Sequence, residues 1–455
     1  MTTSVAMTNE TDALLREHLL RPDGQEDVVL ATYAPSTGHQ RWTALLRDVV
    51  APEPGDRAVH GNASFTGDYV VRAATQAATD GLGVGILHSH PHGRGWQRMS
   101  PFDADAEGSY AYLAEAITGK PLLGMTLAGI GHAWSARTWA DDATPEWAES
   151  VRVDAGQLRV TWNDDLRPTP RPQDSQQRTI SAWGPALQAD LARLRILVVG
   201  VGSVGLDVAV RLAATGVQHL AVMDPDVVKH LNLDRLIGAT REDAELHRPK
   251  ADVAARLMCN AATAENPDIV GYQMSVCDPA APAIALDYDV IFSCVDRPWP
   301  RAVLNALAYT DLIPIIDGGI AIDAFDDGNG MRNATWRSHV LRPGRPCLVC
   351  DQQLDPATIQ IDRQGVLNDP HYIAGAGPET RRGHENVALL SASVSAGLLT
   401  QFVSLIAAPG GESEPGPLRY ILSTHTLEHL SHRSSRRCHF EQTIAAGDNR
   451  LRLTG

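Results

Sequence analysis

Hydrophobic and polar residues follow two different patterns in the two parts of the chain. In the first part, "EDVVLATYAP" (26–35) and "GLGVGILHSHP" (81–91) are short apolar runs that predict strands. The stretch "SPFDADAEGSYAYLAEAIT" (100–118) carries helix-forming residues behind a Ser-Pro start and predicts a helix. The first part is therefore predicted to be a mixed α+β domain.

The second part shows a regular strand and helix alternation. The stretch "RILVVGVGSVGLDVAVRLAATGVQHLAVMDPD" (195–226) predicts a strand, a glycine turn, a helix and a second strand. "YDVIFSCVD" (288–296) and "LIPIIDGGI" (312–320) continue as buried strands followed by acids. Such βαβ units form parallel sheets between helices, so we expect an α/β fold with a Rossmann-like, mostly parallel sheet and flanking helices.

A linker separates the two patterns. "WNDDLRPTPRPQDSQQ" (162–177) contains three prolines and several charges but no apolar run. A chain of 455 residues also exceeds one comfortable core. We predict one domain over residues 1–161, a linker over 162–177 and a second domain over 178–455.

One long uncharged stretch, residues 386–411, approaches the length of a membrane span. Its apolar residues recur at helical spacing (Val387, Leu390, Val394, Leu398 and Phe402), and serines, Thr400 and Gln401 dilute it. We therefore predict a buried helix and no membrane partner. The N-terminus has no basic segment followed by an apolar one, so we expect a cytoplasmic protein.

Charge and cysteine content narrow the function further. A formal net charge of −15 argues against nucleic acid as the main partner, which would require a basic surface. Six cysteines in a chain of this length do not form a disulfide framework. Only Cys347 and Cys350 are close together, which indicates a reducing compartment and a metal site.

Two histidines in the first domain are predicted to share a strand face. His88 and His90 lie two residues apart, and side chains alternate along a strand. Ser100 is predicted to cap the next helix, with Pro101 at its first position and Asp103 one turn in. Two imidazoles and a carboxylate would bind Zn²⁺ and leave a fourth position for water. The alternative is that Ser100 and Asp103 only cap the helix and that the histidines are surface residues.

The whole constellation resembles the JAB/JAMM (MPN) metalloprotease family over roughly residues 12–145. The family motif is an upstream Glu, then His-x-His-Pro, then Ser-x-x-Asp, matched here by Glu26, "HSHP" and "SPFD". Nine residues separate His90 from Ser100, where the commonest family spacing is seven. The resemblance implies that His88, His90 and Asp103 bind a catalytic Zn²⁺. It also implies that Glu26 is the general base and that Ser100 hydrogen-bonds the oxyanion.

A glycine-rich turn opens the second domain. Gly200, Gly202 and Gly205 form G-x-G-x-x-G between a strand and a helix, and Asp224 ends the next strand. The turn lets phosphates approach a helix N-terminus, and the acid is placed for a ribose. Taken alone, this pattern indicates an NAD-binding Rossmann protein.

The residues that follow favour a different chemistry. They are Asp226, Asn232, Arg235, Lys250 and Asp296, the last a magnesium ligand candidate at a strand end. Hydride transfer does not need an Asn-Arg-Lys set beside its phosphates. Cleavage of ATP between the α and β phosphates does, because charge builds on those oxygens in the transition state.

These motifs resemble the ThiF/MoeB/ubiquitin-activating superfamily from about residue 178 to 440. The resemblance implies that Gly200, Gly202, Gly205, Asp224 and Asp226 line the ATP site. It implies that Asn232, Arg235 and Lys250 hold phosphates and that Asp296 holds Mg²⁺. Arg178 matches an entry-segment arginine that reaches a neighbouring subunit's ATP, so we expect a homodimer.

The cysteines fit this family only in part. Relatives hold a structural zinc with two C-x-x-C pairs, whereas here Cys347 and Cys350 are joined by Cys438 alone, with Glu441 in the last position. A second, structural Zn²⁺ and three ordinary buried cysteines are both open. Cys259, Cys277 and Cys294 are predicted to lie in the core. Residues 351–385 contain no cysteine, so no thioester-forming nucleophile is visible there.

Together the two sites predict a bifunctional enzyme of a prokaryotic ubiquitin-like pathway. One domain would process or remove the modifier at its C-terminal glycine, and the other would adenylate that carboxylate, with a conjugating enzyme as a further partner. One alternative is sulfur-carrier activation for thiamine, molybdopterin or cysteine-type biosynthesis. Another is a binding scaffold with both sites degenerate.

Overall fold

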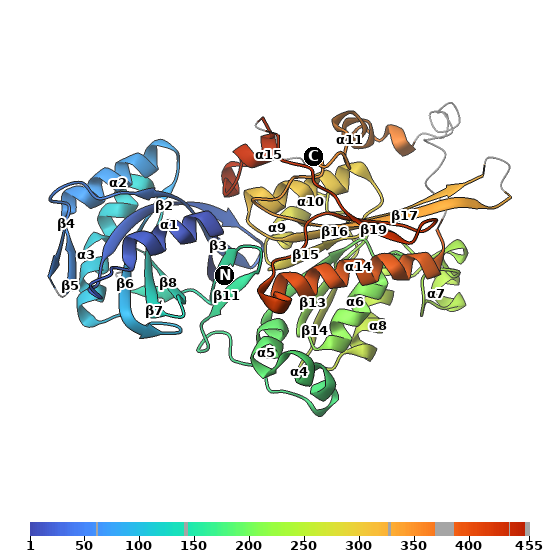
Figure 1. The fold of residues 1–455 in the computed structure, drawn as a ribbon, viewed down its shortest axis with the longest axis horizontal. Helices are drawn as coiled ribbons and strands as arrows, with labels where there is room; N and C mark the ends of the chain where they lie inside the picture. The colour runs from blue at the N-terminus through green and yellow to red at the C-terminus, as the bar shows by residue number, and fades with distance from the viewer. Residues whose placement is uncertain (61, 141–143, 326–328, 369–385, 436, 451–455) are drawn as a thin grey trace. The chain divides into compact units, whose positions relative to one another are not determined.

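The computed structural model describes the chain except residues 61, 141–143, 326–328, 369–385, 436 and 451–455. It divides into two compact units (Figure 1). The first contains Met1–Pro168 with residues 310–312 and 443–450, and the second contains Thr169–Tyr309 and Ile313–Gln442. The division after Pro168 falls in the proline-rich segment 162–177. The two short later segments differ from the predicted boundaries, which placed them in the second domain.

The first unit is built on a nine-stranded sheet in the order β11-β10-β1-β3-β2-β6-β7-β8-β9. Short strands β4 (Arg57–His60) and β5 (Asn62–Phe65) form a separate hairpin. The strands of the main sheet are β1 (Thr2–Thr8), β2 (Val28–Thr37), β3 (Arg41–Val50), β6 (Gly83–Arg94), β7 (Leu122–Ile130), β8 (Trp134–Trp139), β9 (Pro145–Trp147), β10 (Ser150–Asp154) and β11 (Arg159–Trp162).

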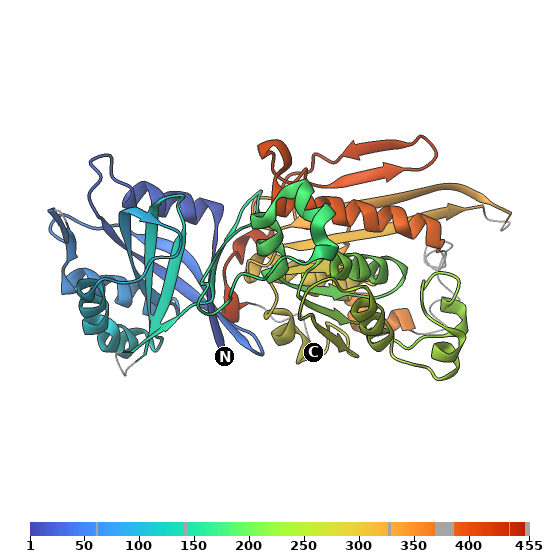
Figure 2. The ribbon, with the colours of Figure 1, turned by 90° about the horizontal axis from the view of Figure 1, so that it is seen from below.

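Helices cover both faces of this sheet (Figures 1 and 2). Leu15 and Leu19 of α1 (Asn9–Leu19) join a buried apolar cluster on one face. Helices α2 (Gly67–Thr79) and α3 (Pro101–Thr118) contribute to a second cluster on the other face. The sheet is therefore buried on both sides, as a mixed α+β layer structure requires.

The predicted start of α3 is confirmed. Ser100 is the N-cap and Pro101 the first helical residue. The Ser100 hydroxyl accepts a hydrogen bond from the Asp103 N–H at 3.2 Å, and the Asp103 carboxylate accepts one from the Ser100 N–H at 2.7 Å. This reciprocal capping box fixes Asp103 in the first turn.

The second unit contains an eight-stranded sheet in the order β14-β13-β12-β15-β16-β17-β18-β19. Strands β14 to β16 of this order are parallel, and β17, β18 and β19 continue the sheet antiparallel. The strands are β12 (Arg195–Val199), β13 (His219–Met223), β14 (Asp268–Tyr272), β15 (Val290–Ser293), β16 (Ile315–Ala324), β17 (Met331–Leu341), β18 (Leu418–Ile421) and β19 (Thr426–His429). The predicted Rossmann-like sheet is confirmed.

Helices flank both faces of this second sheet. Figure 1 shows α10 on the face opposite α6 and α14. The helices are α4 (Gln177–Trp183), α5 (Pro185–Arg193), α6 (Ser203–Thr215), α7 (Arg241–Glu245), α8 (Lys250–Ala261), α9 (Ala281–Ala285), α10 (Pro298–Thr310), α11 (Pro356–Arg363), α14 (Ala388–Ala407) and α15 (His439–Gln442).

Helix α14 is the long apolar segment predicted to be buried. Within the described residues, it alone has the length and composition of a membrane span. It packs against α6, β16 and β17, with Val394, Leu398 and Phe402 buried. Its Gln401 Nε2 donates to the Gly416 carbonyl at 2.7 Å, so even its polar side has an internal partner. Helix α14 is thus a core helix of the second unit.

Candidate functional site

The first unit brings His88, His90 and Asp103 together. Nε2 of His88 lies 3.6 Å and Nε2 of His90 3.5 Å from the same oxygen, Oδ2 of Asp103. Their ligand atoms all lie within 4.8 Å of one another. Strand β6 supplies the histidines and the capped end of α3 supplies the acid. Two imidazole nitrogens and one carboxylate are a fitting donor set for tetrahedral Zn²⁺ with one open position.

Strand pairing also brings Glu26 to this cluster. Strands β2 and β6 are antiparallel with Val28 opposite His88, the Ser89 N–H donates to the Asp27 carbonyl at 3.1 Å, and Glu26 is near enough for its charge to act on the pKa of His90. The neighbouring residue fixes this end of β2. Asp27 is buried and pairs with Arg57, and its N–H donates to the Ser89 hydroxyl at 3.1 Å.

The charges of this cluster are mutually dependent. A hydrogen bond with Asp103 is the main cause that raises the pKa of His90, and the negative charge of Glu26 adds to it. Burial opposes ionisation of Asp103, but hydrogen bonds from His88 and His90 hold the pKa of this carboxyl well below its usual range. Asp103 is therefore an anion, as a metal ligand must be.

A buried polar network lies behind the histidines. Glu107 accepts hydrogen bonds from Arg137 Nε at 2.9 Å and from Trp139 Nε1 at 2.7 Å, and its Oε1 lies 3.8 Å from His88 Nδ1. Arg137 Nη1 also donates to Thr126 Oγ1, which lies 3.3 Å from His88 Nε2. The sequence patterns gave no indication of these residues. The one local sign is Gly124, where an added Cβ would lie 2.1 Å from Glu107 Oε2.

A cavity of about 960 Å³ opens in the second unit where the strand order reverses. Strands β12 and β15 are sequence-distant neighbours, and ligands of doubly wound sheets bind beyond the carboxyl ends of such strands. Gly200 has φ = 85°, and a Cβ there would lie 2.7 Å from the Cys294 carbonyl oxygen. At Gly205 a Cβ would meet the Gly200 oxygen at 1.9 Å. Both positions require glycine for the tight turn into α6.

Nearly all of the predicted ATP-site residues line this cavity. They are Gly200, Gly202, Asp224, Asp226, Asn232, Arg235, Lys250 and Asp296. Gly205 lies behind the turn instead. Asp224 accepts hydrogen bonds from the Val201 N–H at 2.8 Å and the Asp226 N–H at 2.9 Å, and burial raises the pKa of its carboxyl.

The cations of the cavity have acidic or carbonyl partners. Lys250 Nζ lies 2.7 Å from Asp226 Oδ2. Arg235 Nη1 donates to Asp234 Oδ1 at 2.8 Å and to the Leu231 carbonyl at 2.5 Å. Incoming phosphates would have to exchange these partners. Both side chains line the cavity.

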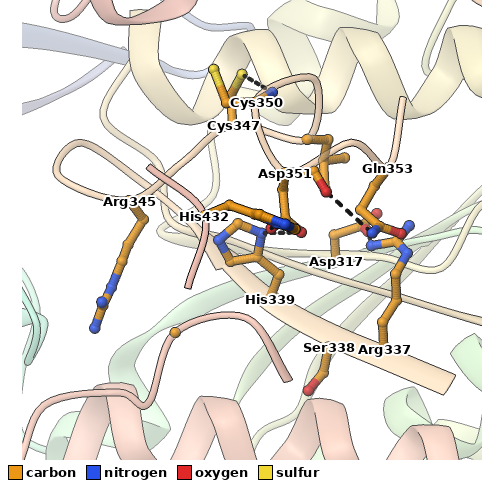
Figure 3. A network of polar contacts seen from close by, with 12 residues as sticks. Asp317, Arg337, Ser338, His339, Arg345, Cys347, Cys350, Asp351, Gln353 and His432 are labelled. Carbon is orange, nitrogen blue, oxygen red and sulfur yellow. Dashed lines mark hydrogen bonds and ion pairs between the residues drawn. The ribbon is translucent and has the colours of Figure 1, made fainter. Parts of the chain in front are cut away.

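A second charged group, Asp317 with Arg301 and Arg337, lies at the cavity, and its two arginines are among the lining residues. Figure 3 shows Asp317 with Arg337. Asp317 is fully buried and accepts hydrogen bonds from Arg301 Nε at 3.0 Å, from Arg337 and from the Ser293 hydroxyl at 2.7 Å. Burial opposes ionisation, but the two arginines lower the pKa of Asp317. One anion with two cations leaves a net positive charge beside Gly318 and Gly319.

Cys347, Cys350 and Cys438 converge as a three-thiol cluster, with all sulfur atoms within 4.8 Å of one another. Burial raises the pKa of Cys347 and of Cys438. Glu441, proposed from the sequence as a fourth ligand, accepts a hydrogen bond from Ser434 Oγ at 2.7 Å. Three soft ligands fit a zinc ion only in part. Figure 3 shows Asp351, directly after Cys350, beside His339 and paired with His432 at 2.7 Å.

The other cysteines differ from the prediction in part. Cys259 is exposed on α8, so its placement in the core was wrong: it occupies the solvent side of an amphipathic helix. Cys277 is buried and Cys294 half-buried, and both line the cavity. Burial raises the pKa of Cys277 to about 12, which keeps this thiol protonated. The cysteine-free segment 351–385 lies partly outside the described residues.

Arg178 is exposed on α4 and is not among the residues that line the cavity of its own chain. Its predicted role in a partner's site stays a prediction.

The model of the ThiF family matches residues 174–436, more than half of the 455 residues. The chain belongs to the ThiF family. The match begins after the first unit's His88 cluster, which therefore lies outside it. The cavity and its glycine turn lie within the family match. Cys347 and Cys350 of the three-thiol cluster also lie within it, whereas Cys438 lies beyond its end at residue 436.

Curated relatives of this ThiF-family chain include two fungal proteins named adenylyltransferase and sulfurtransferase. One, uba4 of Aspergillus clavatus, is 30% identical over 133 residues, which cover 29% of this chain and 26% of the relative. The other, UBA4 of Meyerozyma guilliermondii, is 28% identical over 193 residues, covering 41% of each chain. The matches thus span well under half of these relatives' length.

Solved structures with a similar arrangement include E. coli MccB with ATP. Its TM-score is 0.45 at 16% identity, with 59% of this chain and 74% of that chain covered. A second is PaaA, with a TM-score of 0.41 at 16% identity, covering 56% of this chain and 81% of that chain.

Proposed function

We propose that the second unit adenylates the C-terminal carboxylate of a small sulfur-carrier or ubiquitin-like protein. The observation that supports it most is the cavity at the strand-order switch, which gathers the glycine turn with Asn232, Arg235, Lys250 and Asp296. An NAD site would not need these cations. The relatives named adenylyltransferase and sulfurtransferase favour the sulfur-carrier alternative over a modifier-conjugation pathway.

The reaction uses the chain's own charges at the phosphates. A carboxylate oxygen of the carrier attacks the α-phosphorus of ATP, the bond from that phosphorus to the bridging oxygen breaks, and pyrophosphate leaves. Lys250, Arg235 and Asn232 stabilise the charge on the phosphate oxygens. Asp296, exposed after β15, would hold Mg²⁺, and Asp224 would accept hydrogen bonds from the ribose.

The test is ATP–pyrophosphate exchange with a panel of purified sulfur-carrier and ubiquitin-like proteins that end in Gly-Gly. We expect exchange with at least one full-length carrier and none when its last glycine is removed. Exchange should survive replacement of Cys259, Cys277 and Cys294 singly, since no thioester on the chain is required. ATP binding without exchange for any carrier would contradict the proposal.

The first unit supports a second activity, zinc-dependent hydrolysis after a C-terminal glycine. Its basis is the convergence of two imidazoles and Asp103, with Glu26 close enough for its charge to raise the pKa of His90. A bound Zn²⁺ would supply an acidified water and polarise the scissile carbonyl. Glu26 would take the water proton and pass it to the leaving nitrogen, and the Ser100 hydroxyl would donate to the developing oxyanion.

Chelation and metal analysis test this second activity. The purified chain should contain zinc that is lost in His88→Ala, and cleavage of a carrier fused through its Gly-Gly end should stop with a chelator and return with Zn²⁺. Persistent cleavage in a zinc-free preparation would contradict it.

The assembly is proposed to be a cytoplasmic homodimer in which Arg178 serves the partner's ATP. Mixing Arg178→Ala and Lys250→Ala chains, each inactive alone, should then restore part of the exchange activity. No recovery despite demonstrated subunit exchange would count against this arrangement. A conjugating enzyme would be a further partner only if the carrier is a ubiquitin-like modifier rather than a sulfur carrier.

A further inference from the structure

The segment between His90 and Ser100 is longer than the commonest spacing of the JAB/JAMM motif that it resembles, and it folds back on His90. Strand β6 continues past the histidines to Arg94, and a turn then returns the chain toward α3. Gln97 lies on this return, half-buried, with its side chain pointing to His90. Oε1 of Gln97 lies 3.3 Å from Nδ1 of His90.

The orientation of the Gln97 amide follows from its own partners. Its Nε2 donates to the Arg94 carbonyl at 2.8 Å and to the Gly95 carbonyl at 3.2 Å. Carbonyl oxygens only accept, so the NH₂ group must face them and Oε1 must face the histidine. A flipped amide would set its one oxygen against these two carbonyl oxygens. The acceptor facing His90 is thus fixed by the backbone.

This acceptor determines which nitrogen of His90 carries the proton. An oxygen beside Nδ1 favours Nδ1–H in the neutral ring, so a bound metal would displace the Nε2 proton that faces Asp103 and take the lone pair on Nε2. Nε2 is the atom 3.5 Å from Asp103 Oδ2, on the side where His88 Nε2 also points. Gln97 therefore aims the lone pair of His90 at the point where the three ligand atoms meet.

The backbone around Gln97 accommodates this contact. A Cβ at Gly93 would lie 2.4 Å from Gln97 Oε1, so glycine leaves the space that the amide occupies. The other histidine has a different neighbour: Glu107, held by Arg137 and Trp139, lies 3.8 Å from His88 Nδ1, beyond hydrogen-bond distance. His88 has its hydrogen bond at Nε2, with Thr126 Oγ1 at 3.3 Å, so among the described contacts His90 is the histidine whose Nδ1 is held by a direct hydrogen bond.

We propose that Gln97 is a positioning residue that fixes the tautomer and ring direction of His90 for metal binding. The inference rests on the proposed zinc site at His88, His90 and Asp103. Outer-shell acceptors of this kind raise metal affinity by holding a ligand in its binding orientation, and their loss costs about 10- to 100-fold.

The experiment measures Zn²⁺ affinity of the full chain by competition with a chromophoric chelator, counting only the zinc that His88→Ala abolishes. This excludes any zinc at the three-thiol cluster. Gln97→Ala should lose about 10- to 100-fold in affinity and shift the visible spectrum of the Co²⁺-substituted site. Gln97→Leu keeps a side chain of similar size without an acceptor beside Nδ1 and should lose as much as Gln97→Ala. Arg98→Ala is the matched control, because Arg98 is exposed and pairs only with Asp165 among the contacts described for it.

The outcomes separate the two claims. Equal affinity and an unchanged Co²⁺ spectrum in Gln97→Ala would overturn the role of Gln97 alone. An affinity in Gln97→Leu equal to that of the parent chain would overturn the acceptor argument. Absence of any His88-dependent metal in the parent chain would overturn the zinc site, and this inference with it. Circular dichroism of each variant confirms that the fold is intact.

Discussion

The two sites of this chain differ in how far they are assembled before a ligand arrives. At the first, two imidazole nitrogens already lie 3.6 and 3.5 Å from one carboxylate oxygen. At the second, Lys250 pairs with Asp226 and Arg235 with Asp234, so the groups needed at the phosphates are engaged elsewhere. A metal site must be built in advance because coordination geometry is strict. A cavity for a large flexible anion can exchange partners on binding.

The largest effect is expected at Glu26, the proposed general base of the first site. Glu26→Gln should retain His88-dependent zinc and lose about 100- to 10,000-fold in cleavage rate, because only proton transfer is removed. Zinc content measured on the same preparation is the control. Cleavage as fast as in the parent chain would show that Glu26 is not the base.

The second site should respond strongly to loss of one cation. Lys250→Ala is expected to reduce ATP–pyrophosphate exchange about 100- to 1,000-fold, since a preorganised charge at the transition state is removed. Lys229→Ala is the matched control, because Lys229 is exposed and does not line the cavity. Equal losses in both variants would mean that general charge, rather than position, matters.

Preassembly of the first site depends on close packing around Glu107. Gly124→Ala should lower the free energy of unfolding by about 1–3 kcal/mol, because the new methyl overlaps the carboxylate. Gly108→Ala on α3 is the control, since its Cβ would lie 3.4 Å from Trp139, an ordinary contact. Denaturant unfolding of the two variants measures the difference. No difference between them would show that the Glu107 region is loosely packed.

Acid should weaken the second unit through a buried histidine. Burial lowers the pKa of His339 to about 3, and among the described residues neither ring nitrogen has a hydrogen-bond partner. In the unfolded chain the His339 ring takes up a proton below about pH 6.5, whereas in the folded chain it stays neutral down to about pH 3. The free energy of unfolding therefore decreases as the pH falls between these two values. The expected slope is about 1.4 kcal/mol per pH unit between roughly pH 6 and 4. His339→Met should lack this component in pH-dependent unfolding, and identical slopes would contradict the assignment.

His90 should act in the opposite direction in the metal-free protein. Its pKa is raised, so its contribution to stability is present at low pH and disappears as pH rises through the folded value. The pH dependence of the free energy of unfolding is thus expected to have opposite signs for His90 in the first unit and His339 in the second.

Local patterns in the sequence predicted much of this architecture. The G-x-G-x-x-G turn, the apolar runs before Asp224 and Asp296 and the Ser-Pro helix start each depend on neighbours within a few residues. The structure places them as expected, with α6, β13 and α3 beginning or ending where the patterns change. His88 and His90 share a face for the same reason, because strand alternation is a local property.

Contacts between distant segments were not predictable in this way. Glu107 and Arg137 are thirty residues apart and meet only because α3 packs over β7 and β8. Residues 310–312 and 443–450 cluster with the first unit through long-range contacts that composition does not reveal. Gln97 lies in the loop between His90 and Ser100. The sequence shows that this loop is long, but it does not show where the Gln97 side chain points. The prediction for Cys259 was wrong because free cysteines are usually buried, whereas this one lies on the side of α8 that faces solvent.

The carboxylate of Asp103 caps a helix end and also faces the two histidines. Its Oδ2 accepts the Ser100 N–H at 2.7 Å and is also the oxygen nearest both histidines. Any cation drawn to that oxygen acts on the same atom that keeps the first turn of α3 from fraying. The rate at which the Ser100 amide hydrogen exchanges with solvent should therefore depend on whether a cation is bound at His88, His90 and Asp103. Hydrogen exchange at the start of α3 would then report cation binding.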